Sequence, residues 1–420
     1  MTVASLDTAP KVRNPEVGKR DAMKSFAVCL LCMVFSSAGL AEIPWKFVVV
    51  GDTRSNGEDN GVNIAILGEI ADEIVAQNAE FVLVPGDLVI GGVNQTAIES
   101  QFNTWRNTMQ PVYDDGIPVY VVRGNHDVGS PAGTTAWNNV FPELPDNGPS
   151  GELNLTYSVI HKNALIIALD QYIASHRVNQ TWLNSQLSAN TRPHIFVLGH
   201  EPAFKVNHTD CLDDYSANRN AFWFSIERAG GRTYFCGHDH FYNHASVDND
   251  GEPDNDVHQY VVGTGGAPFS PWAGNYDGVN NYYTLTNIKH VGQYGYVLCE
   301  VNGLKITLTW MERTGEEIYT AGQVWSYTAA MTGDINNDGA VDFRDFAVFA
   351  EHWLEGVKIL AGDFIPPAGV GFEDIGFFAK RWLNTDCSGS NNCDGADLNL
   401  SGGVDFVDFA VLANNWLKTE

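Results

Sequence analysis

Short apolar runs alternate with longer amphipathic segments along residues 43–327 of the chain. The clearest amphipathic segment, residues 61–79, carries Ile64, Leu67 and Ile70 at helical spacing and predicts a helix. The apolar runs are rich in β-branched and aromatic side chains and have the length of buried strands. These runs are residues 46–50, 81–84, 119–122, 195–198 and 233–236. Their alternation with helical segments predicts an α/β domain.

Each of the five runs is followed by a glycine and then by polar residues that can bind metal ions. Glycine lets the chain turn sharply, and polar residues after a strand lie at its carboxyl end, where open α/β sheets build their sites. The five blocks are Gly51-Asp52-Thr53-Arg54, Gly86-Asp87, Gly124-Asn125-His126-Asp127, Gly199-His200 and Gly237-His238-Asp239-His240. We expect them to converge on one edge of the sheet.

Carboxylates and neutral nitrogen ligands around two divalent cations suit the hydrolysis of phosphate esters. Such cations acidify a water and neutralise the charge that grows in the transition state. The type and order of the blocks resemble those of the calcineurin-like metallophosphoesterase family, over about residues 43–327. This resemblance implies a four-layer α/β/β/α sandwich with a centre of two divalent ions, drawn from Mn, Fe, Zn and Mg. It implies the metal ligands Asp87, which bridges both ions, Asp52 and His240 at the first ion, and Asn125, His200 and His238 at the second.

The resemblance also implies catalytic roles for the third block. His126 would contact the phosphate and protonate the leaving oxygen, while Asp127 orients its ring. One position departs from the family pattern, which has His where this chain has Arg54. A guanidinium stays protonated and cannot ligate a cation. We therefore expect the first ion to bind more weakly, and Arg54 to grip a phosphate oxygen instead.

Three more positions bear on this departure. Purple acid phosphatases, which resemble this domain, carry a Tyr ligand where this chain has Ile90, so that subgroup is disfavoured. His208 and His244 are candidates to fill the place that Arg54 leaves or to contact substrate. The alternative for both histidines is an ordinary polar role in loops. An inactive relative of the family is a further alternative.

A repeat begins near residue 331, where the chain changes character. Three copies of one helical unit span residues 341–354, 370–383 and 404–417. Their Phe, Ala, Trp and Leu residues recur at spacings of three and four and must bury against one another. The segment from residue 331 holds 15 acidic and 5 basic residues, a net charge of −10.

Two of the three copies follow a loop with the spacing that calcium requires. Oxygen ligands recur through the twelve positions, and a glycine at the sixth makes the tight turn. The ligands are Asp334, Asn336, Asp338, Ala340 through its carbonyl, Asp342 and Asp345 in the first loop, and Asp397, Asn399, Ser401, Gly403, Asp405 and Asp408 in the second. The middle copy lacks several of these oxygens and should bind no calcium. Duplicated loops ending in Asp resemble the type I dockerin family, which implies a small all-α calcium-loop domain and a cohesin-type partner.

The start of the chain is typical of a secretory signal. Residues 1–22 are polar, and Met23-Lys24 precede an apolar run at 26–35 and small residues up to Ala41. We expect Met23 to be the true start and cleavage to follow Ala41. A membrane anchor is the alternative, but the run of about ten residues is shorter than the roughly twenty a span needs. We therefore predict a secreted or extracellular protein, in the periplasm or at a cell surface.

Cysteine usage agrees with export. Cys387 and Cys393 flank a short polar loop and could form a disulfide, whereas pairing among Cys211, Cys236 and Cys299 stays open. Five cysteines follow the signal segment. Because this number is odd, at least one thiol is free or bonded to another molecule.

The net charge of −27 argues against a nucleic-acid-binding surface, which would need patches of Lys and Arg. A phosphate ester must then be attracted locally by bound cations. We predict a phosphoesterase domain over residues 42–330 and a dockerin-like domain over residues 331–420. The expected reaction is hydrolysis of phosphomonoesters or phosphodiesters by metal-activated water. The alternative is a non-catalytic phosphate-binding or scaffold protein whose function lies in the dockerin-like domain.

Overall fold

The chain divides into two compact units, Met1–Ala330 and Met331–Glu420. The computed structural model describes residues 43–253, 255–272, 274, 276, 282–329, 364, 370–387 and 391–415. The expected signal segment (residues 1–41), the first calcium loop (residues 334–345) and the first helical repeat lie outside the described residues.

The first unit contains two β-sheets. The six-stranded sheet has the order β13-β12-β11-β1-β2-β3, in which β1, β2 and β3 run parallel and the other neighbours run antiparallel. Its strands are β1 (Trp45–Val49), β2 (Val82–Val84), β3 (Val119–Val121), β11 (Gly295–Asn302), β12 (Lys305–Gly315) and β13 (Ile318–Thr328). Three of the predicted apolar runs therefore lie side by side in this sheet.

The other two predicted runs lie in a seven-stranded sheet of order β10-β8-β9-β7-β6-β5-β4. Its centre, β5, β6, β7 and β9, is parallel, and β4, β8 and β10 pair antiparallel with their neighbours. The strands are β4 (Tyr157–His161), β5 (Ala164–Ala168), β6 (His194–Leu198), β7 (Thr233–Cys236), β8 (Tyr242–Asp248), β9 (Val257–Val262) and β10 (Thr284–Val291). The five blocks thus come from two sheets, and the expectation of a single sheet edge was wrong.

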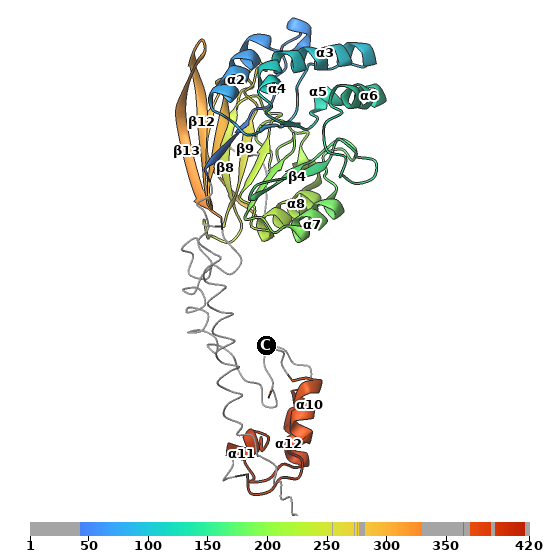
Figure 1. Ribbon diagram of the computed structural model, residues 1–420, viewed down its shortest axis with the longest axis vertical. Coiled ribbons are helices and arrows are strands. Elements are labelled where there is room, and N and C mark those ends of the chain that lie inside the picture. Colours follow the sequence, from blue (N-terminus) through green and yellow to red (C-terminus); the bar gives the residue numbers. More distant parts are fainter. Residues whose placement is uncertain are drawn as a thin grey trace, which may run out of the picture. The chain divides into compact units, whose positions relative to one another are not determined.

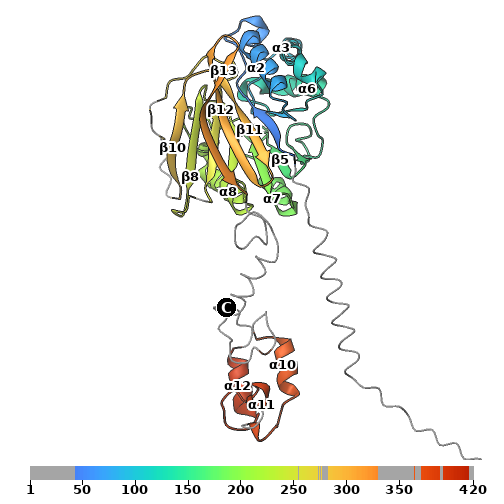
Figure 2. The same cartoon turned by 60° about the vertical axis from the view of Figure 1, so that its left-hand side comes forward.

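Helices cover the outer faces of the two sheets (Figures 1 and 2). Beside the six-stranded sheet lie α2 (Ile64–Ala76), α3 (Gln95–Thr108), α4 (Gln110–Asp114), α5 (Asn125–Val128) and α6 (Ser130–Val140), with the 3-10 turn η1 (Asp59–Gly61). Beside the seven-stranded sheet lie α7 (Gln180–Ala189) and α8 (Ser216–Arg228), with η2 (Leu212–Tyr215). This arrangement confirms the predicted four-layer α/β/β/α sandwich. No helix of the described residues has the length and apolar content needed to cross a membrane.

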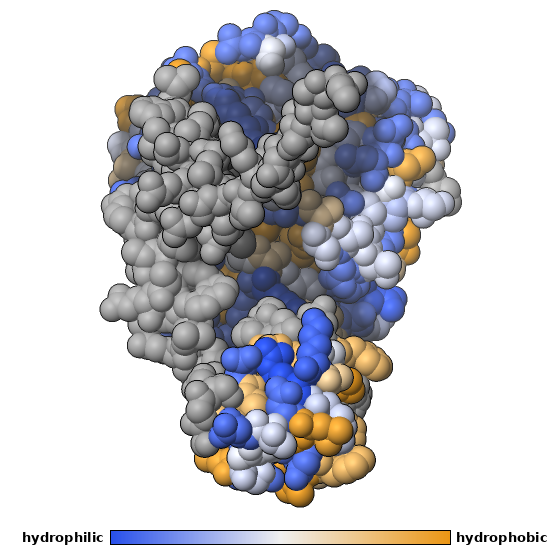
Figure 3. Space-filling model, turned by 60° about the horizontal axis from the view of Figure 1, so that its bottom comes forward, coloured by the Kyte–Doolittle hydropathy of each residue, from blue (hydrophilic) through white to orange (hydrophobic). Residues whose placement is uncertain are grey.

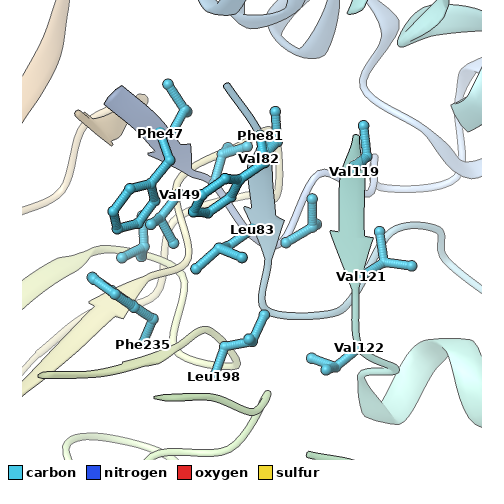
Figure 4. Packing of buried hydrophobic residues seen from close by; sticks show 14 of the residues in the cluster. Phe47, Val49, Phe81, Val82, Leu83, Val119, Val121, Val122, Leu198 and Phe235 are labelled. Carbon is cyan, nitrogen blue, oxygen red and sulfur yellow. The ribbon is translucent and has the colours of Figure 1, made fainter. Parts of the chain in front are cut away.

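The two sheets bury one hydrophobic core between them. The ring of Phe47 in β1 lies 4.7 Å from that of Phe81 and 4.7 Å from that of Phe196 in β6. Figure 4 shows Phe235 and Leu198 of the seven-stranded sheet facing the side chains of β1 and β2. All of these side chains are fully or almost fully buried. The carboxyl ends of β1, β2, β3, β6 and β7 are fixed by this packing.

The helix predicted at residues 61–79 is α2. It begins at Ile64 because the Asn63 side chain accepts a hydrogen bond from the Ile66 amide and caps the helix. Its buried residues include Leu67, Ile70 and Ile74, as the helical spacing predicts.

The described part of the second unit contains α10 (Phe372–Ala379), α11 (Asn391–Asp394) and α12 (Phe406–Asn414). A disulfide joins Cys387 and Cys393, which confirms that predicted pairing, and Cys211, Cys236 and Cys299 are buried free thiols. Hydrophobic and hydrophilic side chains are mixed among the coloured residues on the face that Figure 3 shows.

Candidate metal centre

Three of the predicted ligands have unusual backbone conformations. Asp52, Asp87 and His238 adopt φ angles of 53°, 53° and 72°, a left-handed region that residues other than glycine rarely occupy. Such conformations are costly and persist where packing imposes them, often at functional sites. Here each one lies two or three residues beyond the end of a strand, in the turn that follows it. The strand ends therefore hold these side chains in a fixed direction.

The glycines of the blocks make room for the ligands. A Cβ atom on Gly124 would lie 2.1 Å from Oδ1 of Asp87, and one on Gly237 would lie 2.2 Å from Oδ2 of Asp52. At Gly86, φ is +82° and a Cβ would lie 2.6 Å from Nδ1 of His200. The backbone therefore approaches the ligands more closely than any other residue type allows.

Four candidate donor atoms of the second metal ion converge. Oδ1 of Asn125 lies 3.1 Å from Nε2 of His200 and 3.1 Å from Nδ1 of His238. Oδ1 of Asp87 lies 3.5 Å from Nε2 of His200. Ligands that are each about 2.1 Å from one cation lie about 3–3.5 Å apart. The predicted ligands Asp87, Asn125, His200 and His238 are thus brought together.

The protonation of His200 shows that this arrangement suits a cation. Nδ1 of His200 lies 2.8 Å from the Pro85 carbonyl, so it must donate the hydrogen of that bond. Burial lowers the pKa of His200 to about 4, and near neutral pH Nε2 therefore carries only a lone pair. That lone pair faces the oxygens of Asn125 and Asp87. Atoms that would repel one another are stabilised if a metal ion lies between them.

The first ion's predicted ligands, Asp52 and His240, are also close together. Oδ1 of Asp52 lies 3.5 Å from Nε2 of His240 and, among the described residues, has no hydrogen-bond partner. Burial and the Asp87 charge raise the pKa of Asp52, so its ionised form requires a positive charge nearby. Asp52, Asp87 and His200 form a buried group that could hold a metal ion.

Arg54 reaches into the same place. Its Nε lies 3.4 Å from Oδ2 of Asp87, and one of its terminal nitrogens lies 3.4 Å from Nε2 of His240. Its side chain is only 13% exposed. The guanidinium therefore lies among the ligands predicted for the first ion.

His126 is oriented differently from the expectation. Its Nδ1 lies 2.9 Å from the carbonyl of Ile90, so this nitrogen is the donor, and its Nε2 lies 3.9 Å from Oδ2 of Asp87. The Asp127 carboxylate instead accepts the backbone N–H groups of Leu88, Val89 and Gly124 at 2.8–3.3 Å. The expectation that Asp127 orients the His126 ring was wrong, because these bonds commit its oxygens to the turns that carry Asp87 and Asn125.

The structure separates the two additional histidine candidates. His208 is 38% exposed, and its ring lies 4.7 Å from that of His238. Its Nδ1 and its backbone N–H both bond to Oδ1 of Asp239. His244 is instead buried between strands, with Nε2 2.7 Å from Nδ1 of His258, and burial lowers its pKa to about 3. Of the two, His208 lies at the centre and His244 belongs to the core.

Several residues that hold the centre were not found from the sequence. Oε1 of Gln171 accepts the backbone N–H groups of His200 and Glu201 at 2.7 and 2.6 Å. The Pro268 carbonyl accepts from Nδ1 of His240 at 2.8 Å. Asp210 lies 3.4 Å from Nε2 of His238. A backbone carbonyl gives no sequence signal, whereas the acidic block residue Asp239 could have been suspected.

The second calcium loop is described in full. Asp397 accepts the backbone N–H groups of Ser401 and Gly402, and Asp408 accepts those of Asn399 and Asp405, at 2.8–2.9 Å. Gly402 has φ +92°, as the tight turn requires. Asp397 and Asp408 are both buried, at 2% and 0% exposure, so a calcium ion would offset two buried like charges in one loop.

The middle copy retains one part of this arrangement. Asp374 accepts the N–H groups of Phe364 and Gly371 at 2.6 and 2.8 Å. Its bond to Gly371 repeats the bond of Asp408 to Asp405, and its second donor lies one position further from it than that of Asp408. The sequence of this copy lacks most of the calcium-binding oxygens.

Comparisons with known proteins agree with the family resemblances predicted for the two units. Residues 46–242 match the model of the calcineurin-like phosphoesterase family, and residues 332–417 match that of the dockerin type I domain. Both resemblances drawn from the sequence are thus confirmed. No curated protein sequence matches the chain.

Solved structures resemble this chain at low sequence identity. The purple acid phosphatase PPD1 from yellow lupin (Lupinus luteus) seeds has a TM-score of 0.53 and 14% identity, over 73% of this chain and 55% of that chain. The chain thus spans about half the length of the lupin protein. PhoD has a TM-score of 0.48 and 12% identity, over 75% and 77% of the two chains. GAP50, the anchor in the inner membrane complex of Plasmodium, has a TM-score of 0.47 and 18% identity, over 73% and 95%.

Proposed function

We propose that this chain, a calcineurin-like phosphoesterase over residues 46–242 joined to a type I dockerin domain over residues 332–417, hydrolyses phosphate esters in a metal-dependent reaction. The observation that carries the proposal is the convergence of lone pairs from Asp87, Asn125 and His200 beside the exposed edge of His126. A divalent cation held by these residues and His238 would acidify a water and offset charge on the phosphoryl group.

The chain's own residues would bind and orient the ester. His126 is 31% exposed, and its Nδ1–H is committed to the Ile90 carbonyl, so Nε2 is the atom free to exchange a proton with the leaving oxygen. His208, held by Asp239, lies at the open side of His238 and could donate to a phosphate oxygen. The Arg54 guanidinium adds a fixed positive charge on the other side of Asp87.

Substitution of the metal ligands tests this function. Asp87→Ala and His238→Ala should abolish turnover of an aryl phosphate while the circular dichroism spectrum and melting temperature show a folded protein. His161→Ala, which removes a partly exposed histidine paired with Glu80, is the matched control and should keep full activity. Undiminished turnover in both ligand variants would refute the assignment.

A substrate panel would define the reaction further. Phosphomonoesters and phosphodiesters, each assayed with Mn, Fe, Zn and Mg, separate a phosphatase from a phosphodiesterase. A protein that turns over none of them with any metal would instead fit the non-catalytic alternative.

We further propose that the protein is exported and tethered through its dockerin domain. The supporting observations are the signal-like segment ending at Ala41 and the buried disulfide Cys387–Cys393, which is typical of oxidising compartments. Calcium in the two loops would let the acidic domain fold and present a surface to a cohesin-type partner. Binding of a cohesin panel in calcium, and its loss in a chelator, tests this proposal.

A further inference from the structure

The Arg54 guanidinium occupies the part of the centre where the family places its first metal ion. Three contacts fix it there: Nε lies 3.4 Å from Asp87, one terminal nitrogen lies 3.4 Å from His240, and the other donates to the Ser55 carbonyl at 3.3 Å. The Arg54 backbone is also anchored, since it forms a β-bridge with Val62 and its N–H bonds to the Asp87 carbonyl at 3.3 Å. The backbone that carries the guanidinium is therefore held in place beside Asp52 and Asp87.

His240 is bound in a way that removes it as a metal ligand. Its Nδ1 lies 2.8 Å from the Pro268 carbonyl and must carry the proton of that bond. The remaining lone pair, on Nε2, faces a terminal N–H of Arg54. The guanidinium thus takes the lone pair that would otherwise bind the first ion.

Asp87 divides its two oxygens between the two halves of the centre. Oδ1 lies beside Nε2 of His200 in the metal-binding half, whereas Oδ2 lies beside Nε of Arg54. A bridging carboxylate normally faces a cation on each side, and here the cation on the second side is a guanidinium. A divalent ion placed between Asp52, Asp87 and His240 would meet this like charge at close range.

We infer that the centre holds one metal ion, bound by Asp87, Asn125, His200 and His238, and that Arg54 supplies the positive charge of the missing ion. This replaces the two-ion centre, with a weak first ion, that the family resemblance implies. The inference rests on the metal-dependent function proposed above, but it concerns the number of ions and not the reaction. A guanidinium carries a permanent positive charge and can replace the charge of an ion, although it cannot act as a ligand.

The inference is tested by metal content in the full chain. The protein is saturated with Mn²⁺ in excess Ca²⁺, freed of unbound ions by gel filtration and analysed by mass spectrometry. We expect one Mn²⁺ per chain in the wild type and two in Arg54→His, because the substitution removes the like charge and restores a ligand. Arg192→His adds a histidine on an exposed loop before β6, at the end of that strand opposite His200, and should stay at one. All variants share the same calcium loops, so differences between them report the centre alone.

Electron paramagnetic resonance supplies a second readout, and its wild-type spectrum tests the inference without any variant. Wild-type protein should give the spectrum of an isolated Mn²⁺, whereas Arg54→His should give that of an exchange-coupled pair. Two ions or a coupled spectrum in the wild type would overturn the inference, and so would a single ion in folded Arg54→His. If one ion binds but no ester is hydrolysed, the inference stands and the proposed function fails. If the wild type hydrolyses esters with two bound ions, the proposed function stands and the inference fails.

Discussion

His126 donates its Nδ1–H to the carbonyl of Ile90, 2.9 Å away. This bond sets the orientation of the imidazole and leaves Nε2 facing Asp87. Proton donation to a leaving group contributes about 10²–10⁴-fold to a rate. His126→Ala should therefore lower turnover by about that factor for phosphate esters with poor leaving groups, and much less for activated aryl esters. Steady-state kinetics over a leaving-group series measures this. A loss independent of the leaving group would argue against the role.

Asp127 should behave differently from His126. Its carboxylate accepts three backbone N–H groups in a fully buried position. Asp127→Ala should lower the free energy of unfolding by about 2 kcal/mol or more, because it leaves buried donors without acceptors. His126→Ala, which truncates a partly exposed side chain, should leave the urea midpoint nearly unchanged. Equal stability of the two variants would contradict the role of Asp127 in holding the turns around Leu88 and Gly124.

Two glycines form a matched pair for the geometry of the centre. A Cβ on Gly124 would meet Oδ1 of Asp87 at 2.1 Å, whereas a Cβ on Gly68, in α2, would meet nothing within 4 Å. Gly124→Ala should abolish metal binding and activity. Gly68→Ala should keep both and raise the free energy of unfolding by up to about 1 kcal/mol, the difference in helix propensity. Metal analysis and thermal melts check the pair. An active Gly124→Ala would show that the turn can relax.

The two histidine candidates should also separate in experiment. His208 lies against His238 at the open side of the centre, and His244 is buried beside His258. If His208 donates to a phosphate oxygen as proposed, His208→Ala should raise KM more than it lowers kcat. His244→Ala should lower the melting temperature by leaving a cavity in the core, with little change in KM. The reverse pattern would exchange their roles.

The calcium loops offer a comparison within one domain. Asp397 and Asp374 occupy copies whose sequences differ in calcium-binding oxygens. Asp397→Ala should lower bound calcium by one ion per chain, measured by equilibrium dialysis. Asp374→Ala should leave the calcium count unchanged and destabilise the domain, because the N–H groups of Phe364 and Gly371 lose their acceptor. Loss of calcium in the Asp374 variant would show that the middle copy binds the ion.

Asp256 should make stability fall as pH rises. It is 5% exposed, and within the described part of the chain its Oδ1 has no hydrogen-bond partner. Burial and the charges of Asp248 and Asp250 raise its pKa to about 6. The folded pKa is above the unfolded one, near 3.9, so the wild type loses stability between about pH 4 and 6.

Asp256→Asn removes this titration. At pH 7.5 it should melt at a higher temperature than the wild type, with a gain of about 1 kcal/mol once solvent screening is considered. The gain should vanish below about pH 4. Asp146→Asn, on an exposed loop, is the control and should show no such dependence. A gain in stability that is constant with pH would show that it does not come from removing the Asp256 charge.

The sequence alone determined the local parts of this protein. Strand length, glycine after each strand and polar residues in the next positions are short-range properties, and they picked out the candidate site residues from Asp52 to His240 in their order. The same holds for the repeated loops and for the pair Cys387–Cys393, which a short polar segment separates. Local spacing and backbone freedom impose these features before any tertiary packing.

Only the tertiary structure decided how those parts meet. It divided the five blocks between two sheets. The His126 ring forms its hydrogen bond with the Ile90 carbonyl and not with Asp127, and the Arg54 guanidinium lies between Asp87 and His240. Backbone carbonyls are the same at every position, so no pattern of side chains can reveal which one accepts from which histidine. The reach of an arginine toward residues 33 and 186 positions away likewise depends on the packing of two sheets around a shared core.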